Sequence, residues 1–323
     1  MPIDKYPDIG YYPSWKDGIV EAMKTVKETA QLYLFETKTN KNREVKPFNT
    51  SLLKWIGSKQ RMAHEIISYF PIEFGTYFEP FLGSGGVLGT LIPKTAIASD
   101  TFAPLMEIWQ VLKNSPETIK KWYQERWERM AKGHKVEVYE EIKASYNSNP
   151  NGADLLFLTR SCYGGVVRFR KADGYMSTPC GVHNPISPDS FSRRVATWHK
   201  RIYGTTLLHL DYEEAMSLAK PGDLIYCDPP YSHSQTILYG SQSFSLEHLL
   251  SVIEKCKERE VFVALSIDGT KRSGNFICDL PIPDGLFERE MLIDIGHSML
   301  KRFQMNGKTL EGEKVSDRLL LTY

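Results

Sequence analysis

The 323-residue sequence lacks the features that assign a chain to a metal-binding, secreted or membrane class. Its five cysteines include no close pair with the spacing of a zinc site, so we expect reduced thiols and no metal. It has no signal-like N-terminus and no apolar run of membrane-spanning length, which predicts a cytoplasmic protein without a membrane partner. The formal net charge is only +1, so global charge neither favours nor excludes a nucleic acid as ligand.

The sequence also lacks the common phosphate-binding motifs. Its glycine-rich run, Gly83-Ser84-Gly85-Gly86, is not followed by the Lys-Ser/Thr pair of a P-loop, and it is not a full Gly-x-Gly-x-x-Gly. An acidic residue, Asp100, ends the next predicted strand, roughly where nucleotide-binding folds place the acceptor for ribose hydroxyls. An adenosyl group without phosphates therefore fits this region better than ATP or NAD.

Apolar runs separated by turn signals predict an α/β fold with a mixed seven-stranded sheet. The expected strands cover residues 76–79, 96–99, 206–210, 224–227, 261–267, 286–295 and 315–322, and the last two form an antiparallel hairpin. We predict a catalytic domain over residues 48–112 and 204–323, with a mostly helical and loop-rich insert over 113–203. Residues 1–47 form an N-terminal extension, in which one amphipathic helix either docks on the body or pairs with another chain.

The four residues Asp228-Pro229-Pro230-Tyr231 directly follow an apolar strand that ends at Cys227. Two consecutive prolines exclude helix, so they hold a carboxylate and an aromatic ring on a stiff loop. Open α/β sheets place their ligands at this carboxyl end of the strands. The arrangement suits methyl transfer to an exocyclic amine: the Asp228 carboxylate and the Pro229 carbonyl accept its hydrogens, and Tyr231 stacks on a flipped base.

Three motifs in this order resemble the Dam-type (D12 class) adenine-N6 DNA methyltransferases. The resemblance begins at Leu53-Lys54-Trp55-Ile56-Gly57-Ser58-Lys59, and it continues through the segment Glu79-Pro80-Phe81-Leu82-Gly83-Ser84-Gly85 and the Asp-Pro-Pro-Tyr loop. The stretch from Leu158 to Gly165 is similar to a fourth family segment, but Gly164 stands where the family usually has Asn. The similarity extends over most of residues 48–323.

The resemblance implies a Rossmann-like fold, S-adenosylmethionine as cofactor, and a specific set of site residues. The cofactor would lie against Trp55, Lys59, Glu79, Pro80, Phe81, Gly83, Gly85, Asp100, Asp211 and Asp228, with Lys54 assisting. Asp211 would accept from the adenine amine of the cofactor, although it could also cap a helix that begins near Tyr212. The catalytic residues would be Asp228, Pro229, Pro230 and Tyr231.

The insert carries the local positive charge that the whole chain lacks. Residues 160–203 contain eight basic and two acidic side chains, a local net charge of +6. Such a cluster favours contacts with DNA phosphates, and arginine can also read guanine edges. The predicted DNA-binding residues are Arg160, Tyr163, Arg168, Arg170, Lys171, Arg193 and Arg194, and Tyr175 could also fill the space that a flipped base leaves.

The sequence therefore predicts a site-specific methyltransferase acting on adenine N6 in double-stranded DNA. We expect a monomer rather than a dimer, working in a restriction-modification system with a cognate endonuclease. The alternatives are a cytosine-N4 DNA methyltransferase, an adenine-N6 RNA methyltransferase, and a DNA-binding protein that keeps the fold as a scaffold. Cytosine-N4 enzymes more often carry Ser at position 228, and the acidic residues at 79, 100, 211 and 228 argue against loss of catalysis.

Overall fold

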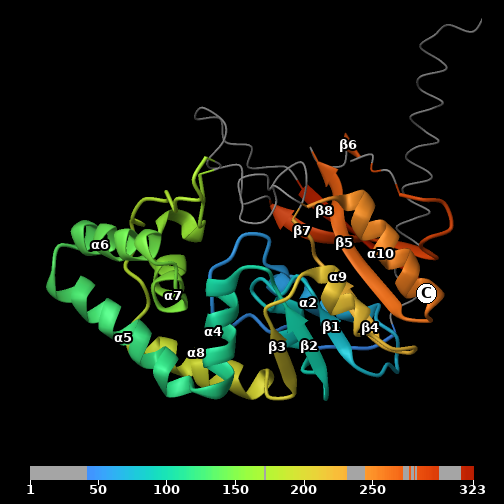
Figure 1. The fold of residues 1–323 in the computed structure, drawn as a ribbon, viewed down its shortest axis with the longest axis horizontal. Helices are drawn as coiled ribbons and strands as arrows, with labels where there is room; N and C mark the ends of the chain where they lie inside the picture. The colour runs from blue at the N-terminus through green and yellow to red at the C-terminus, as the bar shows by residue number, and fades with distance from the viewer. Residues whose placement is uncertain are drawn as a thin grey trace, which may run out of the picture. The chain divides into compact units, whose positions relative to one another are not determined.

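The elements of this computed structural model are arranged around a mixed β-sheet (Figure 1). The structure describes residues 42–170, 172–230, 244–271, 276–277, 280, 282–297 and 314–323. The predicted N-terminal helix, Lys171 and Tyr231 lie outside these ranges. The strands are β1 (Tyr77–Glu79), β2 (Ala96–Ser99), β3 (Thr205–Leu208), β4 (Leu224–Cys227), β5 (Phe262–Lys271), β6 (Phe276–Ile277), β7 (Arg289–His297) and β8 (Lys314–Leu321).

The strand order β3-β2-β1-β4-β5-β8-β7 confirms the predicted seven-stranded mixed sheet. Strands β1 to β5 pair in parallel, and β8 is antiparallel to both of its neighbours, β5 and β7, so the terminal hairpin is also confirmed. The parallel strands were predictable because a strand covered on both faces is a short apolar run in the sequence. In β4, for example, all four residues are buried. The two-residue β6, which pairs with β5, is too short to give such a signal.

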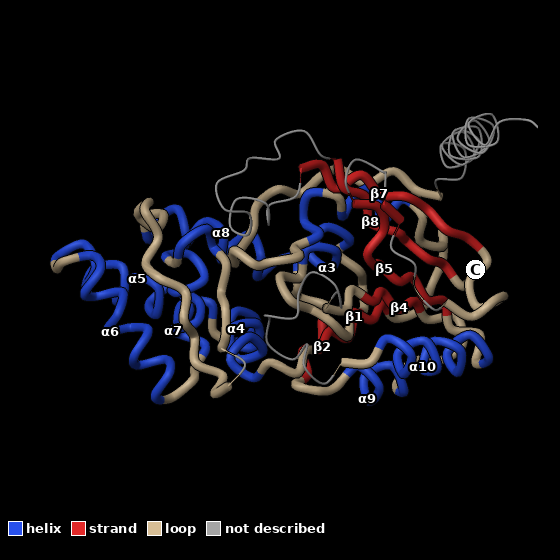
Figure 2. The backbone as a smooth tube through the Cα atoms, turned by 90° about the horizontal axis from the view of Figure 1, so that it is seen from above, coloured by secondary structure: helices blue, strands red, loops and turns tan. Residues whose placement is uncertain are grey.

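Helices cover both faces of the sheet. Figure 2 shows α9 (Tyr212–Ser217) and α10 (Leu246–Glu258) on one face and α3 (Gly86–Leu91) on the other. The remaining helices are α2 (Ala63–Ser68), α4 (Ala103–Asn114), α5 (Pro116–Lys132), α6 (Lys135–Ser148), α7 (Gly152–Ser161) and α8 (Pro188–Arg201), with 3-10 turns η1 (Lys59–Arg61) and η2 (Tyr163–Gly165). No helix among the described residues is long and apolar enough to cross a membrane.

Side-chain caps explain several of these helix boundaries. Asn151, Ser187 and Ser245 each accept a hydrogen bond from a backbone N–H in the first turn of α7, α8 and α10. These bonds satisfy donors that a helix start leaves unpaired. Helices α5 and α8 also begin with proline, whose missing N–H and fixed φ suit the first helical position. Short polar residues before apolar periodicity therefore mark these helix starts in the sequence.

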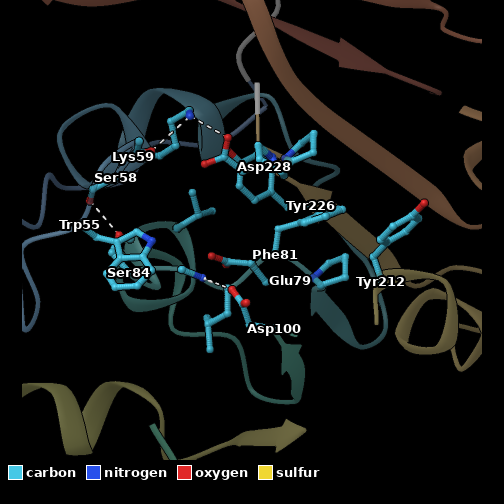
Figure 3. A pocket seen from close by; sticks show the side chains of 18 of the residues that line it. Trp55, Ser58, Lys59, Glu79, Phe81, Ser84, Asp100, Tyr212, Tyr226 and Asp228 are labelled. Carbon is cyan, nitrogen blue, oxygen red and sulfur yellow. Dashed lines mark hydrogen bonds and ion pairs between the residues drawn. The ribbon is translucent and has the colours of Figure 1, made fainter. Parts of the chain in front are cut away.

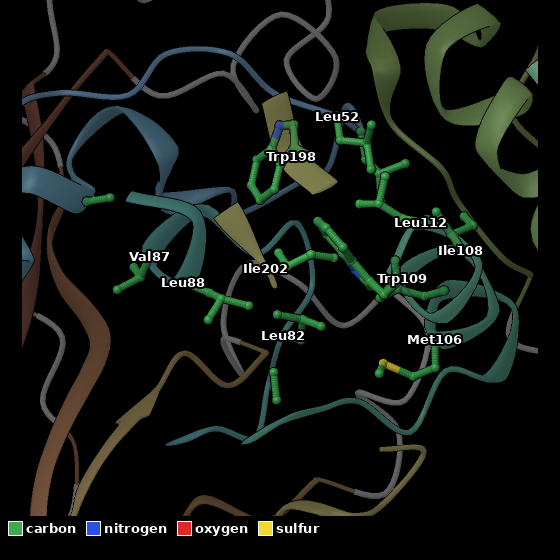
Figure 4. Close-up of a cluster of buried hydrophobic side chains, with 14 of the residues drawn as sticks. Leu52, Leu82, Val87, Leu88, Met106, Ile108, Trp109, Leu112, Trp198 and Ile202 are labelled. Carbon is green, nitrogen blue, oxygen red and sulfur yellow. The ribbon is translucent and has the colours of Figure 1, made fainter. Parts of the chain in front are cut away.

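The core that joins the helical insert to the sheet is built around two tryptophans (Figure 4). Trp109 of α4 and Trp198 of α8 are fully buried, and their ring centroids lie 5.3 Å apart. Trp198 packs directly on α3 at Gly89, where a Cβ atom would come within 2.5 Å of the indole ring. The Trp109 indole N–H donates to the carbonyl of Gly83 at 3.0 Å. The same core that holds α8 in place therefore also supports the glycine-rich loop.

Candidate active site

The carboxyl ends of β1, β2 and β4 bring three acidic residues to one edge of the sheet. Glu79 ends β1, Asp100 follows β2 and Asp228 follows β4. The chain moves outward from β1 through β2 to β3 and then returns to β4 on the other side of β1. Ligands in open α/β sheets bind at such a point, where the strand order reverses.

A pocket opens at this point, and most of the predicted site residues line it (Figure 3). The predicted residues that line the pocket are Trp55, Lys59, Glu79, Pro80, Phe81, Gly83, Asp100, Asp211, Asp228, Pro229 and Pro230. Gly85 is not among the lining residues: it adopts a left-handed conformation (φ 61°) as the N-cap of α3, and its Cα faces the Trp109 ring. Lys54 lies instead against Gly165, and Tyr231 is outside the described residues.

The structure adds lining residues that the sequence prediction missed: Ile56, Gly57, Ser58, Leu82, Ser84, Gly86, Val87, Thr101, Tyr212, Tyr226 and Phe244. Most of them are chain neighbours of predicted residues. Tyr226 could have been inferred because side chains two apart on a strand share a face, and Asp228 is two residues on. Phe244 had no signal, since its place depends on how the chain returns after the Asp-Pro-Pro-Tyr loop.

Hydrogen bonds to two neighbouring segments fix the glycine-rich loop: one segment follows β2, and the other is the Leu-Lys-Trp segment. Asp100 accepts hydrogen bonds from the backbone N–H of Gly83 (3.0 Å) and of Phe102 (3.1 Å), one on each carboxylate oxygen. The hydroxyl of Ser84 donates to that of Ser58 at 2.8 Å, which ties the loop to the Leu-Lys-Trp segment. Asp100 therefore fixes the loop, and its predicted contact with ribose hydroxyls stays a prediction.

Glu79 is a buried carboxylate at the floor of the pocket. Burial raises its pKa to about 8, while hydrogen bonds from the Tyr77 hydroxyl and from a backbone N–H act in the opposite direction. The Tyr77 hydroxyl donates to Glu79 Oε2 at 2.6 Å. Below pH 8 the side chain is mostly protonated, and a cationic ligand group would favour its ionised form.

Lys59 forms an ion pair with Asp228 across the pocket from Glu79 (Figure 3). Its Nζ atom lies 2.7 Å from Asp228 Oδ1 and 3.5 Å from Asp317 Oδ2 of strand β8. Burial lowers the pKa of Lys59, but the charges and hydrogen bonds of the two aspartates outweigh this effect, and the net shift is upward. The lysine therefore lines the pocket as predicted and also contacts the residue predicted to be catalytic.

Aromatic rings form the wall near the start of α9. Phe81 and Tyr212 are stacked with centroids 5.1 Å apart, and Phe244 meets both rings edge-on. Asp211, beside this wall, is the N-cap of α9: its Oδ1 accepts from the backbone N–H of Glu213 at 2.9 Å, within a capping box. The capping role considered for Asp211 is confirmed, and its predicted contact with an adenine amine stays a prediction.

The donor set favours a nucleoside with a cationic group over a phosphate-bearing ligand. Among the residues that the structure describes, the charged side chains lining the pocket are four carboxylates and Lys59, and that lysine already contacts two aspartates. Carboxylates repel phosphates, but they attract ammonium or sulfonium groups and accept hydrogen bonds from ribose hydroxyls. The aromatic wall offers flat apolar surface for a base.

Some residues of the basic cluster at 160–203 have a structural role. Arg160 is buried, and its guanidinium donates to the carbonyl of Leu52 at 2.7 Å. Arg194 donates to the carbonyl of Ser51 at 2.8 Å. The predicted DNA contact of Arg160 is therefore corrected: this arginine satisfies backbone carbonyls of the segment before Trp55. Arg194 is half-buried in the same kind of contact, whereas Arg193 is exposed and its guanidinium donates to the Ser190 hydroxyl within α8.

Another part of the basic cluster lies on a hairpin formed by residues 162–180, of which residue 171 is not described. Backbone bridges join Cys162 to Cys180 and Phe169 to Met176. Near the tip, the exposed Arg170 pairs with Asp173 at 2.6 Å and lies over the Tyr175 ring at 4.3 Å. This hairpin also carries the half-buried Arg168 and the exposed Tyr163, and the predicted DNA contacts of these residues stay predictions.

A row of aromatic rings connects this hairpin to the pocket. Phe169, between Arg168 and Arg170, meets Phe102 edge-on at 5.6 Å. Phe102 in turn lies 6.4 Å from Trp55, which lines the pocket. The arginine-bearing hairpin therefore packs beside the pocket wall that Trp55 forms.

A family model and the sequences of related proteins indicate the same family. The model of the D12 class N6 adenine-specific DNA methyltransferases matches residues 55–281. A DNA adenine methylase of Vibrio cholerae serotype O1 is 25% identical over 233 residues, which cover 67% of this chain and 80% of the relative. The type II methyltransferase M1.LlaDCHI of Lactococcus lactis subsp. cremoris is 24% identical (66% and 79% covered), and M.MjaIII of Methanocaldococcus jannaschii is 28% identical (58% and 70% covered).

Proposed function

Because this chain belongs to the D12 class of N6 adenine-specific DNA methyltransferases, we propose that the pocket is its active site and that Asp228 orients the target amine. The enzyme methylates adenine N6 in DNA with S-adenosylmethionine as methyl donor. The observation that carries the assignment of the site is the convergence of Glu79, Asp100 and Asp228 at the switch point of the sheet.

The residues that line the pocket fit this cofactor. S-adenosylmethionine supplies an electrophilic methyl group on a cationic sulfur, which keeps the electrons of the broken bond. Glu79 is placed to attract the cationic methionine end, and the loop at Gly83 lets backbone approach the ligand closely. Asp100 and Asp211 can accept from ribose and adenine, with Phe81 and Tyr212 beside the base. Trp55 lines the pocket next to Gly83: a Cβ atom added to Gly83 would lie 3.3 Å from the indole nitrogen of Trp55.

Asp228 and Pro229 act on the substrate amine by accepting its hydrogens. The lone pair of an adenine amine is delocalised into the ring, so the nitrogen is a weak nucleophile. Two fixed acceptors favour the tetrahedral nitrogen, whose lone pair can attack the methyl carbon. The nitrogen becomes positive when the bond forms, and its proton then leaves to the Asp228 carboxylate or to water. A strong base is not required in this sequence of events.

We further propose that residues 113–203 form the target-recognition domain and that the 162–180 hairpin contacts duplex DNA. The exposed Arg170 and the neighbouring Arg168 supply positive charge beside the pocket, and Tyr163 is exposed on the same hairpin. Phosphate contacts by such side chains position a duplex, and arginine forks can read base edges. Arg193 on α8 extends this charge.

We also propose a role in restriction-modification, since two of the relatives are named type II methyltransferases. A cognate endonuclease would then share the target sequence, without a need for physical contact. The enzyme acts as a monomer in this proposal, because one chain carries both the pocket and the hairpin beside it. Its place would be the cytoplasm, where it reaches cellular DNA.

Nucleoside analysis tests the proposed substrate. Purified protein is incubated with S-adenosylmethionine and either duplex DNA or RNA of the same sequence, and the digested products are separated. We expect N6-methyladenine from the DNA and background from the RNA. Methylation confined to RNA, or N4-methylcytosine as the DNA product, would assign the pocket to one of the other amino-methyltransferase classes.

The pKa of Glu79 predicts how cofactor affinity depends on pH. At pH 7 the side chain is mostly protonated, and a cationic ligand must displace that proton; at pH 9 it is already ionised. Ionisation of Glu79 should therefore strengthen binding of S-adenosylmethionine by about tenfold between pH 7 and pH 9. Titration calorimetry in buffers of different ionisation enthalpy measures both the affinity and the proton released at neutral pH.

The matched control is Glu79→Gln, which keeps the shape of the side chain and removes its titration. The ligand's own amine titrates in the same range, and comparison of the two proteins at each pH cancels that effect. The ratio of the variant Kd to the wild-type Kd should rise about tenfold from pH 7 to pH 9. A ratio that stays constant would mean that Glu79 does not face the cationic end of the cofactor.

A further inference from the structure

The cation that contacts Asp228 is itself held by a second carboxylate from the last strand of the sheet. Lys59 comes from η1, Asp228 from the loop after β4 and Asp317 from β8. The side chains of Lys59, Asp228 and Asp317 are 6%, 19% and 7% exposed. Figure 3 shows the lysine ammonium and the Asp228 carboxylate pointing toward one another at the pocket. We call these three residues the charge cluster.

The charge cluster as a whole has a net charge, whereas the pair of Lys59 and Asp228 alone has none. An isolated ammonium would be costly to bury, and the two aspartates keep the pKa of Lys59 above its usual value in spite of its burial. Lys59 and Asp228 alone would sum to zero charge. The second carboxylate, that of Asp317, gives the three side chains together one formal net negative charge.

This net charge matters for the reaction because the substrate nitrogen becomes positive as the methyl group arrives. A carboxylate whose charge is cancelled by an adjacent ammonium would stabilise that positive charge poorly. We propose that Asp317 is a positioning residue for methyl transfer: it anchors Lys59 and offsets its charge, so that Asp228 is fixed and retains its negative field at the amine. This inference rests on the proposed role of Asp228.

Among the residues that the structure describes, the neighbouring strands place further titratable groups near Asp228. Glu79 on β1, with a pKa of about 8, lies in the same pocket. Burial raises the pKa values of Tyr226 and Cys227 on β4, and the charge of Asp228 adds to both shifts, so both groups are neutral at pH 7. The Tyr226 hydroxyl is hydrogen-bonded to Ser266 of β5 at 2.8 Å. These groups are common to all variants below, so differences between variants report on the charge cluster.

The first test is Asp317→Asn, which keeps the size of the side chain and removes its charge. We expect the single-turnover rate at saturating DNA and S-adenosylmethionine to fall on the order of tenfold. The Kd values for both ligands should stay within about twofold, because Asp317 lies behind Lys59 and does not line the pocket. Asp317→Glu should restore most of the rate.

The matched control is Glu290→Gln on the same terminal hairpin. Glu290 pairs with Arg318 at 2.6 Å, and Arg318 is the chain neighbour of Asp317 with its side chain on the other face of β8. Loss of this ion pair perturbs the hairpin without touching the charge cluster. The control should keep the wild-type rate, and thermal melts of all variants establish that each is folded.

The pH dependence separates a charge effect from a packing effect. Lys59→Met leaves two neighbouring carboxylates without their cation, so one should hold a proton, and the acid limb of the rate profile should move up by about 1 to 2 pH units. Adding Asp317→Asn to Lys59→Met removes the second carboxylate. The double variant should therefore be faster than Lys59→Met alone at pH values within the shifted acid limb, and its own acid limb should lie back near the wild-type position.

The following outcomes decide the proposal. A slower Asp317→Asn enzyme with unchanged Kd values, together with recovery in the double variant, supports it. A wild-type rate for Asp317→Asn, or losses that simply add in the double variant with an unmoved acid limb, overturns it. Asp228→Ala is assayed in parallel: substantial activity of that variant would remove the proposed role of Asp228 itself, whereas an inactive Asp228→Ala beside a normal Asp317→Asn would remove only the role of Asp317.

Discussion

Asp228→Ala is expected to lower the rate of methyl transfer by roughly a thousandfold or more, with binding of S-adenosylmethionine still measurable. The carboxylate accepts a hydrogen of the target amine and later faces the positive nitrogen, so its loss acts on the transition state. Its pocket neighbours Glu79, Asp100 and Asp211 remain to hold the cofactor. After removal of Asp228, the Lys59 ammonium still lies 3.5 Å from the Asp317 carboxylate.

The experiment measures single-turnover methylation of duplex DNA and, separately, cofactor affinity by calorimetry. The matched control is Asp223→Ala, at the opposite end of the same strand. Asp223 is buried and accepts hydrogen bonds from the backbone N–H groups of Thr76 (2.6 Å) and Lys220 (2.8 Å). Its loss should lower the free energy of unfolding by about 1 to 3 kcal/mol and leave the rate of the folded enzyme unchanged. Robust methylation by Asp228→Ala would exclude the proposed mechanism.

The double variant Arg168→Ala/Arg170→Ala is expected to weaken duplex binding on the order of 10- to 100-fold near physiological salt. Each arginine that contacts a phosphate releases a condensed counterion, so the slope of log K against log salt should become shallower by about 1 to 2. The hairpin that carries both residues packs beside Trp55 through Phe102 and Phe169, which places the loss of charge close to the pocket. Fluorescence anisotropy over a series of salt concentrations measures both quantities.

The control for net charge is Lys220→Ala/Lys255→Ala, which removes two exposed positive charges from the loop after α9 and from α10. Lys255 belongs to α10 and Lys220 follows α9, the two helices that cover one face of the sheet (Figure 2). Their removal should leave the slope unchanged within about 0.3. Equal losses in the two double variants would show that binding depends on overall charge, and the proposal for the hairpin would fall.

The sheet and the pocket were predictable because each depends on local sequence. Strands such as β4 are short apolar runs bounded by turns, and the residues that follow them must lie at the sheet's carboxyl edge. Asp100 and Asp228 therefore line the same pocket although 128 positions separate them in the sequence. The order of the motifs in the sequence indicated the family, and the comparison with known proteins confirms that family.

The sequence alone did not predict which charged side chains are buried, or which residues far apart in the chain contact each other. Arg160 and Arg168 look alike in a count of charges, but one is buried beneath the carbonyl of Leu52 and the other lies on the hairpin. No periodicity distinguishes them, because burial depends on which carbonyls lack partners in the folded chain. The contact of Asp317 with Lys59 joins opposite ends of the described chain, and it follows only from the insertion of β8 between β5 and β7.

Sequencing of modified bases in DNA from cells that express the protein tests the central claim most directly. The claim is that this pocket methylates adenine N6 in duplex DNA with Asp228 at the amine. We predict N6-methyladenine within one recurring sequence in cells that express the wild type, and none above background in cells that express equal amounts of Asp228→Ala. N4-methylcytosine at that sequence, or the same adenine methylation with the Asp228→Ala protein, would contradict the account.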